Sequence, residues 1–248
     1  MGSALLAIAT TAYAREVDES IDAASDGQVE IINISGSVEV FGWSRSAVEV
    51  TGELGDKVEE LILERNGDKV LVKVKVPRNN SNNISSDLVI RVPEDSAIDV
   101  STVSADITVE EVGGEQNLHT VSGDVITQAA GSDISAQAVS GDVEVTGDGG
   151  EAETSANTVS GDVTIVGVSG SVEAEAVSGD LMVRDGSFER ASLNTVNGEI
   201  GFQAGLDSGG KLTVESVNGD VDIQFDGSVS ARFDIETFNG DISNCFGP

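Results

Sequence analysis

The sequence predicts an all-β protein whose larger part is a β-solenoid, a coil of short strands that stack on one another. Three observations predict this fold. Of the 248 residues, 39% are hydrophobic but only 4% are aromatic, and a core of small, β-branched side chains suits thin β-layers. Aliphatic and polar residues alternate between Gln28 and Val92, as they do in strands. From about Ile98 a unit of about 18 to 21 residues recurs, which is typical of stacked repeats.

The repeated unit consists of a valine, a small polar residue, a glycine, an acid and an aliphatic residue. Residues two apart after the acid, such as Val143 and Val145, are expected on one inward face of a strand. Residues before the glycine, such as Ile98 and Val100, form a second inward set. Each unit therefore predicts two short strands joined at Ser-Gly-Asp. The copies read STVSADITV from Ser101, HTVSGDVIT from His119, QAVSGDVEV from Gln137, NTVSGDVTI from Asn157, EAVSGDLMV from Glu175, NTVNGEIGF from Asn194, ESVNGDVDI from Glu215 and ETFNGDISN from Glu236.

The glycine of each unit is predicted to form a corner. The valine before it and the aliphatic residue after it, such as Val121 and Val125, are both expected to be buried, so the backbone must bend, and glycine supplies the dihedral freedom. The units then either coil in parallel or zigzag as an antiparallel sheet. Equal turns and inward positions favour the coil, because stacking places like residues above one another at about 4.8 Å. We expect about eight coils and, from the general crossover preference, a right-handed path.

Three regions are expected along the chain. Residues 1–14 resemble an export signal, residues 15–97 form an antiparallel β-hairpin region that acts as an N-terminal cap, and residues 98–248 form the solenoid repeats. Within the second region, Asn66-Gly67 is a two-residue hairpin signal, because both positions adopt positive φ at low cost. The polar stretch from residue 77 to residue 86 is expected to be a loop.

The first of these regions predicts an exported protein. The apolar run ALLAIATTAYA ends on a small-x-small triplet, Ala12 to Ala14, which resembles the end of a secretory signal peptide. A short helix or strand at the edge of the domain is the alternative. No stretch approaches the roughly 18 apolar residues that a membrane helix needs. The periplasm, the cell surface and the exterior are all open as locations.

The charge balance restricts the partners. With 44 acidic and 13 basic residues the formal net charge is -31, and binding to phosphates needs patches of lysine and arginine. Nucleic acids and anionic membranes are therefore excluded, and glycans, cationic peptides or envelope proteins are better candidates. The single cysteine, Cys245, excludes an internal disulfide framework and a cysteine-based zinc site.

One acid per unit forms a predicted column. If the coils stack, neighbouring carboxylates approach to about 5 Å and repel one another. Two arrangements would relieve the repulsion: each carboxylate faces water and accepts a backbone N–H in its own turn, or a hard cation such as Ca²⁺ lies between the coils. One Gly-Asp per long unit does not match the calcium-binding β-roll repeat of about nine residues, so we assign no metal site. The column is Asp106, Asp124, Asp142, Asp162, Asp180, Glu199, Asp220 and Asp241.

No catalytic or cofactor-binding residues are assigned. His119 is the only histidine and occupies a variable repeat position, as an exposed decoration does. Trp43 and Phe41 are expected to cover the end of the β-core, although a tryptophan also serves as a sugar-stacking platform. A nucleophile elbow between a strand and a helix is not visible. The sequence therefore predicts a non-enzymatic protein, with a polysaccharide-active β-helix enzyme and a calcium-stabilised structural module as alternatives.

The repeats TVSGDV, AVSGDL and SVNGDV, preceded by SSDLVIRVPEDSAIDVSTVSADI, resemble the bacterial putative-adhesin family of β-strand-repeat proteins, a domain of unknown function. The resemblance covers nearly everything after the export-like segment. It implies a β-solenoid protein of the cell envelope with no established reaction. Together with the charge, this favours an exported binding scaffold with an acidic surface.

Overall fold

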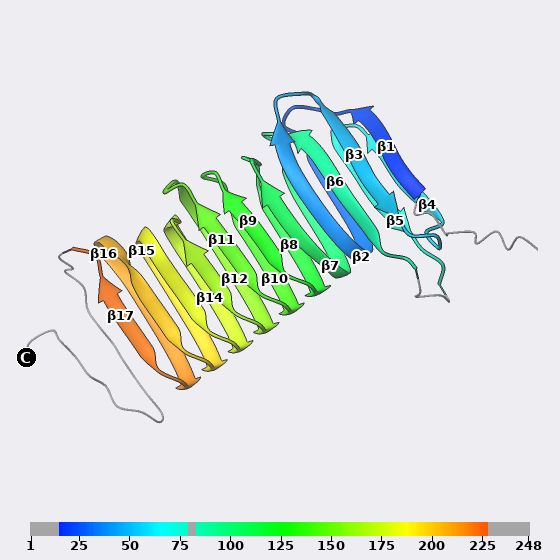
Figure 1. The fold of residues 1–248 in the computed structure, drawn as a ribbon. Helices are drawn as coiled ribbons and strands as arrows, with labels where there is room; N and C mark the ends of the chain where they lie inside the picture. The colour runs from blue at the N-terminus through cyan, green and yellow to red at the C-terminus, as the bar shows by residue number, and fades with distance from the viewer. Residues whose placement is uncertain (1–14, 79–82, 228–248) are drawn as a thin grey trace, which may run out of the picture.

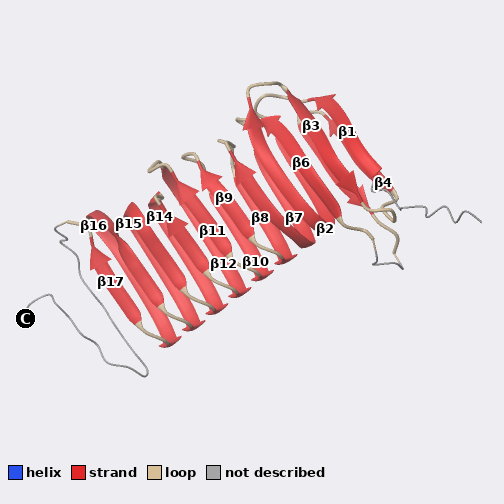
Figure 2. Ribbon diagram, viewed as in Figure 1, coloured by secondary structure: helices blue, strands red, loops and turns tan. Residues whose placement is uncertain are grey.

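The computed structural model describes residues 15–78 and 83–227, and over these ranges it contains strands and no helix (Figure 2). The 17 strands form one hydrogen-bonded sheet system, drawn in Figure 1 as a long stack that starts near β1 and β4 and ends at β17. The predicted β-solenoid is confirmed. The described part of the chain contains no helix that is long and apolar enough to cross a membrane.

Six strands precede the sequence repeats. β1 pairs antiparallel with β3, and β3 pairs antiparallel with β6. β4 and β5 form the predicted hairpin, in which Gly67 has a φ of 67°. These strands are β1 (Arg15–Asp22), β2 (Gln28–Trp43), β3 (Ala47–Leu54), β4 (Glu60–Asn66), β5 (Lys69–Lys75) and β6 (Ser86–Pro93).

Strand β2 differs from the expected antiparallel pairing, which is wrong for this strand. It pairs in parallel with β5, β6 and β7. Its residues Ser35, Gly36 and Ser37 lie in register with Ser104, Ala105 and Asp106 of β7. β2 is therefore a coil of the stack, and it escapes recognition as a repeat because Ser37 occupies the position that holds an acid in the later units.

The remaining strands form the repeats. The strands before each corner stack in parallel, as β8, β10, β12 and β14 do, and the strands after it form a second parallel series with β9, β11 and β13. These strands are β7 (Ala97–Glu110), β8 (Gln116–Ser122), β9 (Val125–Ala129), β10 (Ile134–Ser140), β11 (Val143–Gly147), β12 (Glu151–Ser160), β13 (Val163–Val166), β14 (Ser169–Ser178), β15 (Leu181–Asn197), β16 (Ile200–Asn218) and β17 (Val221–Phe225).

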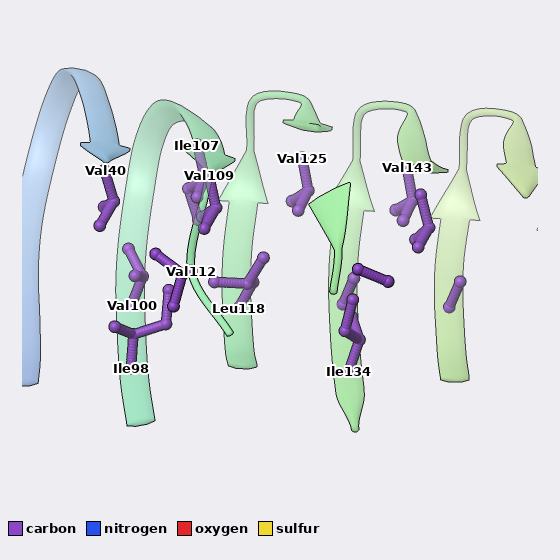
Figure 3. Packing of buried hydrophobic residues seen from close by; sticks show 14 of the residues in the cluster. Val40, Ile98, Val100, Ile107, Val109, Val112, Leu118, Val125, Ile134 and Val143 are labelled. Carbon is purple, nitrogen blue, oxygen red and sulfur yellow. The ribbon is translucent and has the colours of Figure 1, made fainter. Parts of the chain in front are cut away.

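The core lies between the two series of strands. Figure 3 shows Val100 and Leu118, from strands before the corner, in the same interior as Val109 and Val125, from strands after it. All four side chains are fully buried. Among the described residues, aromatic side chains enter this core only near β15 to β17, where the ring centroid of Phe202 lies 6.0 Å from that of Phe188 and 5.9 Å from that of Phe225. The thin aliphatic core predicted from composition is thus present over most of the stack.

The valine before each corner is not buried, contrary to expectation. Val121 is 47% exposed, whereas Val125, after the same corner, is 0% exposed. Two consecutive residues, Val121 and Ser122, both face outward, and the chain turns inward again only after Gly123 and Asp124. The bend therefore falls across the whole Val-Ser-Gly-Asp segment, and it turns the valine out of the core.

Candidate binding surface

The corners stack so closely that a side chain at the glycine has no room. Gly161 has a φ of 150°, and a Cβ atom built on it would lie 2.1 Å from the carbonyl oxygen of Gly141 in the preceding coil. The N–H of Gly141 donates a hydrogen bond of 3.0 Å to the carbonyl oxygen of Ser160. Both the left-handed φ and the close approach require glycine. In the first repeat Ala105 takes this place, and it is not among the described residues with positive φ.

The acids from Asp106 to Glu199 form a column, as predicted from the sequence. The hydrogen-bond donors to their carboxylates differ from the predicted ones. In five of these acids, from Asp106 to Asp180, the Oδ1 atom accepts a hydrogen bond from the backbone N–H of the acid in the next coil, not from its own turn. The donor–acceptor distances are 3.0 Å for Asp106 and Asp124, 2.9 Å for Asp124 and Asp142, 2.8 Å for Asp142 and Asp162, 2.8 Å for Asp162 and Asp180, and 2.7 Å for Asp180 and Glu199. We call Asp106, Asp124, Asp142, Asp162, Asp180 and Glu199 the acidic ladder.

The hydrogen bonds of the acidic ladder offset the repulsion between carboxylates in neighbouring coils. Each backbone N–H directs a partial positive charge at a carboxylate, and a hydrogen bond to an ionised acceptor is stronger than one between neutral groups. The carboxylates remain exposed to water, which screens their mutual repulsion. Within residues 15–78 and 83–227, no group of three or more histidine, cysteine, aspartate or glutamate side chains is arranged to hold a metal ion. Asp241, predicted to continue the column, lies outside the described residues, as do Cys245 and the export-like segment.

A stripe of exposed valines runs beside the acidic ladder, three positions earlier in each coil. Its members have exposed fractions between 41% and 47%, and neighbouring members lie about 4.8 Å apart, because the coils stack at the strand spacing. We call it the valine stripe. It consists of Val103, Val121, Val139, Val159, Val177, Val196 and Val217.

A polar column borders the valine stripe on the other side. Its side chains lie in register in successive coils, two residues before each valine. Asn194 Nδ2 donates to Glu175 Oε1 at 3.4 Å within the column. His119 is half-buried here, which corrects the expectation of an exposed decoration. The polar column consists of His119, Gln137, Asn157, Glu175, Asn194 and Glu215.

The polar column and five members of the valine stripe, from Val139 to Val217, line one open groove of about 1570 Å³ along the stack. Between them, buried threonines hold the corners in place, since Thr158 Oγ1 donates to the carbonyl oxygen of Gly141 at 3.0 Å and Thr195 Oγ1 to that of Gly179 at 3.3 Å. Residues 209–214, at the start of the last described coil, line the groove as well. The groove is therefore continuous over several coils and presents the same chemistry in each.

The groove is absent from the sequence prediction, because the repeat pattern predicts the valine as a core residue. A signal was available in the spacing. Every second residue points inward up to Thr120, and the next inward residue is Val125. Four residues therefore lie between two inward positions, whereas strict alternation would leave an odd number. Two neighbouring residues within the corner must then both point outward. The number of residues between the inward positions therefore indicates that Val121 and its equivalents lie on the surface.

Trp43 lies outside the groove, at the end of β2. Its Nε1 donates to the carbonyl oxygen of Ala47 at 2.8 Å, and the Arg45 guanidinium lies 4.9 Å from the ring centroid. Both contacts hold the indole against the turn that joins β2 to β3. Phe41, two residues earlier on β2, is half-buried.

Comparisons with known proteins support the fold. The Toastrack DUF4097 family model matches residues 29–246, and none of the curated proteins matches the chain. Among solved structures, a putative adhesin from Bacteroides fragilis is similar over 86% of this chain and 98% of its own, with a TM-score of 0.56 and 13% identity. A putative cell adhesion protein from Clostridium sporogenes covers 85% of this chain and 97% of its own, with a TM-score of 0.37 and 11% identity. At these identities the likeness to the Bacteroides fragilis protein extends to the fold alone.

Proposed function

The chain belongs to the Toastrack DUF4097 family, and on that basis we propose that it is a non-enzymatic, exported binding scaffold of the cell envelope. The observation that carries this proposal is the repetition of one surface chemistry in successive coils. Such a surface suits multivalent binding, in which several weak contacts to one elongated partner add up to a useful affinity.

The arrangement of the groove favours binding over catalysis. A catalytic site brings different groups to one point, with a base within hydrogen-bond reach of the group that it activates. Here each column repeats similar side chains along the stack, and His119, the only histidine of the chain, is in register with Ser101 and Gln137. Export is supported by the signal-like segment at residues 1–14, and the name of the Bacteroides fragilis protein agrees with a role in adhesion.

A binding screen tests the proposal. The purified chain is presented to a glycan array and to a panel of synthetic cationic and neutral peptides, at about 20 mM and about 500 mM salt. We expect weak binding to elongated ligands that strengthens with ligand length and, for cationic ligands, falls at high salt, because salt screens exposed charges. Failure to bind any glycan or peptide at low salt would overturn the proposal.

A further inference from the structure

We infer that the valine stripe and the acidic ladder together form a docking surface for a basic amphipathic helix of a partner protein. The inference rests on the proposed function, because it assigns a surface and a partner class to that binding scaffold. Three observations support it: the stripe is apolar, acidic residues follow it in each coil, and the backbone N–H and C=O groups beneath it are already hydrogen-bonded within the stack.

The valine stripe is an apolar surface without a structural role in the core. Val139, Val159 and Val177 are each 45% exposed, whereas the residues next to the corner that pack inward, such as Ala138 and Ala176, are 6% and 5% exposed. An exposed, contiguous apolar stripe with polar borders is typical of an interaction site. From Val139 to Val217 the stripe also lines the groove, so a rod-shaped partner is accommodated lengthwise.

The charge beside the stripe selects the partner. Every coil from Asp106 to Glu199 carries a carboxylate three residues after its stripe valine, and from Asp106 to Asp180 one oxygen of each carboxylate accepts the N–H of the next coil. A second copy of this chain would bring a further net charge of -31 to the interface, and an anionic lipid surface would be repelled in the same way. Lysine or arginine side chains along one edge of a partner are attracted to the carboxylates, and they reduce the repulsion among them.

The hydrogen bonding of the backbone in the stack favours a helical partner over an extended one. The N–H and C=O groups on both sides of the corner pair with neighbouring coils along the stack, as in the β10–β12 pair before the corner and the β11–β13 pair after it. An extended peptide lying along the valine stripe would find no backbone partners there and would leave its own polar groups unpaired. A helix satisfies its backbone internally and needs only side-chain contacts.

The length of the valine stripe sets the length of the helix. Its seven valines span six spacings of about 4.8 Å, which is about 29 Å. At about 1.5 Å per residue a helix of about 19 residues covers this distance. Its apolar residues at i, i+3, i+4 and i+7 would rest on the stripe, and its basic residues would lie along the edge that faces the acidic ladder.

Designed peptides test the inference. The probe is a fluorescent 19-residue peptide with leucine on one helical face and lysine along one border of that face, and the control peptide has the same composition in an order that destroys the amphipathic pattern. We expect the Kd of the control peptide to be at least tenfold higher by fluorescence anisotropy at low salt. Equal binding of both peptides would overturn the inference, because it would mean that charge alone attracts them.

Protein variants locate the surface. Val139→Ser/Val177→Ser removes two members of the valine stripe, and Ile126→Ser/Met182→Ser removes two exposed apolar side chains from the strands after the corner, where they are 44% and 37% exposed. We expect the first pair to weaken binding of the amphipathic peptide at least tenfold and the second pair less than twofold. The circular dichroism spectrum and the thermal midpoint of each variant confirm that it is folded.

The remaining outcomes separate this inference from the proposed function. If the stripe variants bind the peptide as tightly as the parent chain, or if only glycans bind, the docking surface is wrong while the binding scaffold stands. If light scattering shows a dimer that dissociates in Val139→Ser/Val177→Ser, a second copy covers the stripe and the inference is overturned. If no peptide and no glycan binds, both proposals fail together.

Discussion

The backbone N–H of Asp162 donates a 2.8 Å hydrogen bond to Oδ1 of Asp142, one coil earlier in the stack. The same bond recurs from Asp106 to Glu199. A carboxylate that sequence analysis treats as a source of repulsion is thus also a link between coils. The balance of these two effects leads to the first prediction.

Replacing Asp142 separates its charge from its hydrogen bond. Asp142→Asn keeps an oxygen that accepts from Asp162 N–H and removes one negative charge, whereas Asp142→Ala loses both. We expect the alanine variant to be less stable than the asparagine variant by about 1 kcal/mol, the usual worth of one hydrogen bond. Urea denaturation measures the difference. Glu144→Ala, an exposed acid two residues later, is the control and is expected to change stability little; equal stabilities of the alanine and asparagine variants at Asp142 would contradict the role of the bond.

Adding a methyl group at a corner glycine tests the close stacking of the coils. In Gly161→Ala the new Cβ would lie 2.1 Å from the carbonyl oxygen of Gly141, so the backbone must shift. We expect a loss of about 3 kcal/mol or more, which combines overpacking with a left-handed φ. Gly131→Ala is the matched control, because its φ of 73° is also positive but nothing lies within 4 Å of the added atom.

The expected loss for Gly131→Ala is about 1 kcal/mol, the cost of the left-handed conformation alone. Thermal unfolding followed by circular dichroism compares the two variants. Similar midpoints for both would mean that the coils separate easily at their corners, which is incompatible with the stacking described here.

A buried hydroxyl offers a way to stabilise the stack. Thr154 is 0% exposed, its Oγ1 has no hydrogen-bond partner among the described residues, and its neighbours in the adjacent coils are Ile134 and Val172. Thr154→Val replaces the hydroxyl with a methyl group, and we expect it to raise the free energy of unfolding by about 1 kcal/mol, because a buried unpaired hydroxyl is costly. Urea denaturation measures the change.

The control for this prediction lies on the same strand. Thr158 is similarly buried, but its hydroxyl donates to the carbonyl oxygen of Gly141 at 3.0 Å. Thr158→Val is therefore expected to destabilise the protein by about 1 kcal/mol. A stabilising effect in both variants would show that the threonine hydroxyls do not hold the corners.

Salt is expected to stabilise the protein. At a net charge of -31 the acidic ladder and the other surface carboxylates repel one another, and salt reduces this repulsion over a Debye length of about 10 Å at 0.1 M. The thermal midpoint should rise with NaCl, and CaCl₂ at the same ionic strength should raise it by a similar amount. A much larger rise with CaCl₂, together with a fall on adding a chelator, would instead indicate a calcium-stabilised module.

The repeated unit predicts that the coils stack in register, because units of similar length then bury the same positions of each unit in one core. The inward side chains on both sides of the corner, such as Val100 and Val125, follow from alternation alone, and the core contains both. Alternation does not determine the direction of a residue inside a bend. For this reason the pattern predicts Val121 in the core, whereas the structure leaves it 47% exposed.

By itself the sequence determined the β-solenoid, its corner glycines and its column of acids, since each depends on a short motif repeated at a regular distance. The tertiary structure alone decided which atoms meet between coils. It extended the stack to β2, whose Gly36 lies beside Ala105, and it gave the carboxylates from Asp106 to Asp180 a backbone partner in the next coil. It also exposed the valine stripe beside that ladder. These features depend on the path of the backbone between neighbouring coils, which a pattern within one unit does not encode.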